Sequence, residues 1–182
     1  MASAEAILIR FPGTGLVLAE FTAAHPLCTV EATLESARLE GGRASLSVRA
    51  NLRGVEESQI KRLVGDLCAR YGPVGDAGHD SDGWTIRFSV GFHEIESEAA
   101  RYLLGFQTEF GLPWLRIEKG TVTVVAANTT DALGRGRADD IRAWFRERGI
   151  PATIATVPAG LRPLAAGSVA SDSAGPSGTS GW

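Results

Sequence analysis

The hydrophobic periodicity between Ala44 and Lys119 constrains the fold of this chain more than any other feature. Two segments of this stretch place apolar residues at every second position, the period of strands with one buried face. Two others have the spacing of amphipathic helices. The predicted strands are 44–52, 73–79, 84–92 and 113–118, and the predicted helices are 56–71 and 94–110. The elements therefore follow the order strand, helix, strand, strand, helix, strand.

This element order is the split βαβ pattern of ferredoxin-like sandwiches, in which helices cover one face of a mostly antiparallel sheet. The sequence thus predicts an α+β fold with a ferredoxin-like βαββαβ core. The order also resembles that of ACT-like regulatory domains, over the 75 residues of 44–118. Members of those groups commonly sense amino acids or metabolites at a dimer interface. The resemblance therefore implies a sensing role.

The flanking segments are predicted to extend the sheet. Residues 5–23 read as a hairpin of AILIRF and LVLAEFT, joined by a turn at Pro12-Gly13-Thr14-Gly15. A strand at 29–35 is followed by a turn at Gly41-Gly42. After the core, two strands meet around Lys119-Gly120, a helix lies within 130–148, and PATIATV forms a last strand.

We expect one compact domain over 5–158. A division into two small subdomains, 44–118 and 5–43 plus 119–158, stays open. Residues 159–182 are rich in Ala, Gly, Ser and Pro and are predicted to be a disordered tail, because they offer little bulky apolar surface to bury. The tail ends in Trp182, which is a candidate protein-binding anchor, since Trp is enriched among interface hot spots. The alternative is an unselected chain end.

Composition narrows the class of protein. The 18 basic and 21 acidic side chains give a net charge of -3, so binding to nucleic acid is disfavoured. No stretch reaches the roughly 20 apolar residues of a membrane-spanning helix. Cys28 and Cys68 have no CxxC spacing, and we expect both to be core thiols of a cytoplasmic protein.

Three arginines on predicted strands are candidate ligand-binding residues. In a ferredoxin-like sheet, Arg49, Arg87 and Arg116 would line up on the face away from the helices. Three guanidiniums in a row suit the phosphate or carboxylate groups of an anionic small molecule. The alternative is that they are solvated or paired with carboxylates of neighbouring strands. These carboxylates are Glu31, Glu35 and Glu118.

Two further arginines, Arg135 and Arg137, precede a predicted helix start and would assist anion binding by its backbone N–H groups. The alternative is a glycine-rich connector without a ligand. A polar cluster precedes Gly83, and its spacing matches neither an EF-hand nor a zinc site, so a polar turn is favoured. The cluster consists of Asp76, His79, Asp80 and Asp82. We predict no catalytic residue, cofactor or metal site.

These observations favour a non-enzymatic regulatory or adaptor protein that acts through self-association or by binding a protein partner. Open sandwiches with exposed strand edges tend to pair them. One alternative is a small-molecule-sensing module in transcription regulation, with the strand arginines as the ligand-binding residues. A second alternative is an enzyme of unknown reaction, with His79 in the polar turn as its acid or base.

Overall fold

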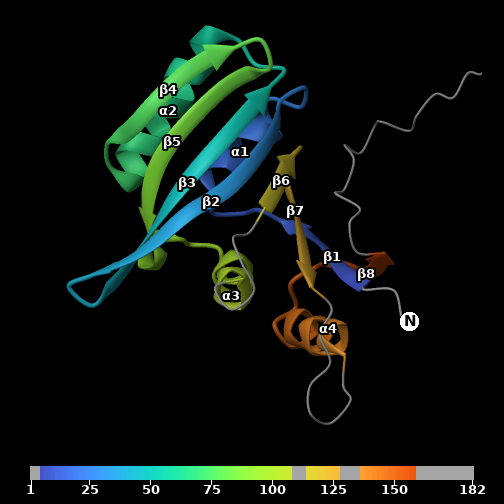
Figure 1. Ribbon diagram of the computed structural model, residues 1–182. Coiled ribbons are helices and arrows are strands. Elements are labelled where there is room, and N and C mark those ends of the chain that lie inside the picture. The colour runs from blue at the N-terminus through green and yellow to red at the C-terminus, as the bar shows by residue number, and fades with distance from the viewer. Residues whose placement is uncertain (1–4, 108–113, 128–135, 159–182) are drawn as a thin grey trace, which may run out of the picture.

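The computed structural model describes residues 5–107, 114–127 and 136–158. In these residues, eight antiparallel strands form one twisted sheet in the order β4-β5-β3-β2-β6-β7-β1-β8 (Figure 1). The elements are β1 (Glu5–Pro12), α1 (Val17–Ala24), β2 (Thr29–Glu40), β3 (Arg43–Arg53), α2 (Glu57–Tyr71), β4 (Val74–Asp80), β5 (Gly83–Gly91), the 3-10 turn η1 (Phe92–Glu94), α3 (Glu98–Gln107), β6 (Trp114–Glu118), β7 (Thr121–Ala127), α4 (Arg137–Glu147) and β8 (Thr153–Pro158).

The predicted α+β class and the extension of the sheet by flanking strands are confirmed, but the core order differs from the ferredoxin-like one. That order would place β6 beside β3. Instead β2 pairs with β3 along one edge and with β6 along the other. The reason is local: Gly41 and Gly42 adopt positive φ, which closes a long β2–β3 hairpin and gives β2 the place beside β3.

The second predicted strand of residues 5–23 is wrong, because this segment forms α1. Val17, Leu18 and Phe21 are buried, at the spacing of one helical face. A short apolar run fits a buried strand or a buried helix equally well, so periodicity did not decide between them. Thr22 then fixes α1 to the sheet: its hydroxyl donates to the Ala19 carbonyl and accepts from the Gly120 N–H, both at 3.0 Å.

Strand register places the apolar face of all central strands on the side that the helices cover. One row of buried side chains runs across five strands through Phe11, Val122, Ile117, Val30 and Leu52. In Figure 1, α2 lies on the β4-β5 part of the sheet and α4 lies at the β1-β8 end, while α1 lies between them and packs against β6, β2 and β7. Phe145 of α4 contacts Phe11, with ring centroids 5.8 Å apart. On the opposite face, β2, β3 and β5 carry mainly polar side chains, whereas β7, β1 and β8 place Val125, Leu8 and Ala155 side by side there.

The two cysteines differ from the expectation that both are core thiols. Cys28 is buried in the core, whereas Cys68 is exposed on α2. Burial raises the pKa of the Cys28 thiol to about 11. Near neutral pH, only about one Cys28 thiol in ten thousand is therefore ionised, and the thiolate is the reactive form.

We predict that iodoacetamide adds once to the native protein, at Cys68, and adds to Cys28 only after unfolding. Intact-mass measurement followed by peptide mapping checks this. Equal labelling rates at both thiols in the native protein would contradict the burial of Cys28.

We also predict that Thr22→Val destabilises the protein by about 1–3 kcal/mol, because the isosteric side chain leaves the Gly120 N–H without its acceptor. The free energy of unfolding in urea measures this. Thr14→Val, at an exposed position of the turn before α1, is the matched control and should be nearly neutral. Equal stability of Thr22→Val and the wild type would show that Thr22 does not hold α1 to the sheet.

Candidate functional site

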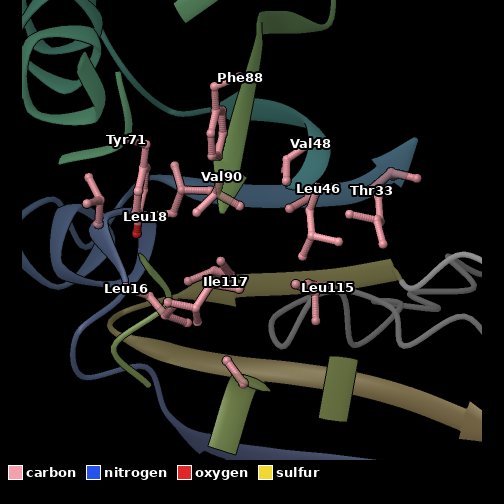
Figure 2. Close-up of a pocket in the computed structure, with 15 residues that line it drawn as sticks. Leu16, Leu18, Thr33, Leu46, Val48, Tyr71, Phe88, Val90, Leu115 and Ile117 are labelled. Atoms are coloured by element: carbon pink, nitrogen blue, oxygen red, sulfur yellow. The ribbon is translucent and has the colours of Figure 1, made fainter. Parts of the chain in front are cut away.

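An apolar cavity of about 80 Å³ lies between the sheet and the segments that cover its apolar face. Strands β2, β3, β5 and β6 form one side of it, and the start of α1 and residues of the η1–α3 segment form the other. Figure 2 shows Leu46 and Val48 on one side, Phe88 and Tyr71 on another, and Ile117 below them. Apart from Thr33 and Tyr71, its lining side chains are aliphatic or phenyl groups. The cavity is therefore suited to an apolar group.

The cavity results from strand alternation and from two small residues. Register sets Leu46 of β3 opposite Val90 of β5, and Val48 opposite Phe88, so that all four face the helices. Ala32 of β2 and Ala100 of α3 also line the cavity, where larger side chains would occupy part of its volume. The space is a partly open pocket rather than a closed void inside the core.

Tyr71, the last residue of α2, brings the one phenol group to the cavity lining. Its ring stacks on Phe88, with centroids 6.0 Å apart and planes 8° from parallel. Burial raises the pKa of Tyr71, and a hydrogen bond with the Val17 backbone opposes this rise. Leu16 offers no side-chain cap at the start of α1, so the Tyr71 hydroxyl lies near backbone N–H groups that have no partner within the helix.

Helix α3 is held beside the cavity by contacts with α4. The Tyr102 ring stacks on Trp144 at 3.9 Å and within 3° of parallel. The Arg148 guanidinium lies 4.2 Å from the Trp144 ring centroid, and its Nε is 3.1 Å from Glu98 Oε1. These contacts fix the side of the helix that carries Glu98 and Tyr102. The opposite side of α3, with Ala100, closes the cavity.

The arginines predicted to bind an anion lie on the opposite, open face of the sheet. Arg49 and Arg87 are direct cross-strand neighbours. They share one carboxylate, because Glu35 Oε1 lies 3.6 Å from Arg49 Nε and 3.4 Å from Arg87 Nε. Glu35 sits at a β-bulge between Leu34 and Ser36, which brings it toward both arginines.

Arg116 does not complete a row with the other two. Because β2 lies between β3 and β6, Arg116 pairs in register with Glu31, whose other neighbour is Asn51 rather than Arg49. The Arg116 residue is only 7% exposed, and it forms ion pairs with Glu31 at 3.7 Å and Glu118 at 3.6 Å. The cross-strand pairing that was the alternative to anion binding is thus present. Anion binding by these three arginines stays a prediction.

The remaining sequence candidates lie elsewhere. Arg137 is the first residue of α4, while Arg135, Trp182 and the tail lie outside the described residues. The predicted polar turn is in large part strand, because Asp76, His79 and Asp80 lie on β4, where His79 contacts the Trp84 ring. Asp82 lies in the turn to β5, and its N–H donates to Asp80 at 2.8 Å. Among residues 5–107, 114–127 and 136–158, no group of His, Cys, Asp or Glu is arranged to hold a metal ion. None of the helices there has the length and apolar character needed to cross a membrane.

Strand alternation in the sequence predicts that many of the cavity-lining side chains are buried, but it does not predict the cavity itself. Alternation identified Leu46, Val48, Phe88 and Val90 as inward residues. The available signal for a void was the small Ala100 on the apolar side of a predicted helix, and it carries weight only once the facing strands are known.

No family model, curated protein or solved structure matches this chain. Its site is therefore interpreted from its own residues.

Proposed function

We propose that this protein is a non-catalytic binding protein, a small-molecule sensor, whose cavity takes a small apolar ligand. The observation that carries this proposal is the apolar lining of the 80 Å³ cavity between the sheet and the start of α1. Apolar cavities stay dry and accept apolar guests, as an engineered cavity of about 150 Å³ that binds benzene or xenon illustrates. A cavity of half that volume suits a guest of a few heavy atoms.

The chemistry of the lining supports binding rather than catalysis. Its polar side chains are Thr33 and Tyr71, with no carboxylate, imidazole, amine or thiol beside them. The raised pKa of Tyr71 keeps its phenol protonated near neutral pH, so it is not a base there. A guest would therefore be held by shape and apolar contact alone.

The position of the cavity would let a bound ligand affect several elements of the fold at once. A guest would contact the start of α1, residues of β2, β3, β5 and β6, and Ala100 of α3 together. It would stabilise the arrangement that holds these elements around it, and a ligand that binds only the folded state raises stability by mass action. A partner that reads the position of α3 would then sense the ligand. This is the regulatory role expected from the sequence, with an apolar ligand in place of an anionic one.

We predict that Ala100→Leu weakens the binding of apolar probes to the cavity. Leucine is a good helix former, and its added carbons would fill the cavity from α3. Methyl NMR shifts and thermal stabilisation with benzene and xenon measure the binding. The wild type should respond saturably, and Ala100→Leu should lose at least about tenfold in affinity, which corresponds to about 1.4 kcal/mol.

The matched control is Ala69→Leu, an exposed alanine of α2 outside this cavity, which should bind the probes as the wild type does. Absence of any saturable response in the wild type would sink the proposal. Equal binding by Ala100→Leu would show that the probes bind elsewhere.

Self-association is the second candidate function, and the uncharged edge strand β8 favours it. Residues Thr153–Pro158 contain no charged side chain, so two copies of β8 could pair without bringing like charges together. The other edge strand, β4, carries Asp76 and Asp80, which oppose such pairing. Paired copies would form a continuous sheet across a dimer, as a regulatory or adaptor protein often does.

We predict that the wild type is a dimer and that Thr156→Lys makes it monomeric, because a lysine on each edge places like charges side by side. Ala77→Lys, on exposed β4, should leave the dimer intact. Light scattering over a concentration series and native mass spectrometry measure this. A wild type that stays monomeric at millimolar concentration rules the association out.

A further inference from the structure

A second hollow lies on the open face of the sheet, on the same strands that line the apolar cavity. It has a volume of about 280 Å³ and is lined by Ser36, Arg38, Ser45, Ser47 and Ser89. Its lining thus consists of four hydroxyl groups and one guanidinium, with no carboxylate among them. It is separate from the apolar cavity, so an inference about it does not rest on the proposed function.

Strand register explains how these side chains come together. Ser36, Ser47 and Ser89 are direct neighbours across β2, β3 and β5, and Arg38 lies opposite Ser45 in β2 and β3. Because side chains alternate along a strand, these positions point away from the helices, whereas Leu46 and Val90 point toward them. The short serines form a low floor between longer arginine side chains, which produces the hollow.

The charge around the hollow is positive. Arg38 forms no ion pair with any carboxylate whose side chain the structure describes. Two residues along their strands from Ser47 and Ser89 lie Arg49 and Arg87, which share the single carboxylate of Glu35. The Arg49 Nε is buried and makes no hydrogen bond among the described residues, the Glu35 Oε1 of its ion pair being 3.6 Å away. One guanidinium at the rim and two beside the floor are thus balanced by one carboxylate in direct contact.

We infer that this serine–arginine hollow binds the phosphate group of a phosphate monoester or of free phosphate. A tetrahedral oxyanion accepts hydrogen bonds on several sides, which matches hydroxyl donors on three strands. Arginine adds a planar donor pair and a permanent charge, the combination that recognises phosphate well. A metal cation would be repelled by the guanidiniums. A neutral sugar would leave the charge unused.

The test is titration of the full chain with inorganic phosphate, followed by calorimetry and by phosphorus NMR, with sodium chloride at matched ionic strength as the reference. We expect saturable binding with a millimolar dissociation constant. Arg38→Gln should weaken it about tenfold, and Ser47→Ala combined with Ser89→Ala should weaken it by a similar factor, since each removes charge or donors at the site. Arg53→Gln, exposed at the far end of β3, is the charge-matched control and should change it less than about twofold.

Two results would overturn the inference. One is a response to phosphate no larger than the response to chloride. The other is equal weakening by Arg38→Gln and Arg53→Gln, which would show only a general effect of net charge. Titration with glycerol phosphate separates the two sources of the group. Tighter binding than free phosphate identifies a monoester whose hydroxyls also meet the serines, and equal binding identifies free phosphate.

Discussion

The pairing of β2 along both of its edges is the interaction on which the rest of the structure depends. Its ladder with β3 and its ladder with β6 join two groups of strands that would otherwise have free edges. Because the ladders from β5 through β3, β2, β6 and β7 to β1 set buried apolar residues beside one another, one apolar face continues across the sheet and all packed helices share it. A sheet broken at β2 would leave Val30 and Ile117 without a common core.

Alternation along β2, β3 and β5 then gives the same strands two different surfaces. Leu46 and Val90 line the apolar cavity on the helix side, and Ser45 and Ser89, each one residue away, line the hollow on the open side. A sheet is about as thick as one backbone, so ligands on the two faces would act on the same hydrogen-bonded strands. An apolar ligand on one face and a phosphate group on the other would therefore be coupled through the same strands.

Sequence periodicity predicted most of the elements, because strands such as 84–92 bury one full face and leave the other wet. Prediction from periodicity was wrong where one sequence pattern is compatible with more than one structure. The run at Val17 and Leu18 is buried in a helix, and its length suits a strand equally. The predicted strand order is wrong at β2, because strand pairing there depends on hairpin closure at Gly41-Gly42 rather than on periodicity. The predicted alignment of Arg116 with Arg49 is wrong for the same reason. The cavity beside Ala100 could not be predicted either, because it depends on which residues of the helices and the sheet face one another.

We propose that a small apolar molecule binds between the sheet and the helices. The most direct measurement is a crystal structure of the full chain under xenon pressure, since xenon binds preformed apolar cavities without needing a polar partner. We expect one strong xenon site bounded by Val48, Phe88 and Ala100. Side chains closed over that space, with no xenon between the sheet and α3, would contradict it.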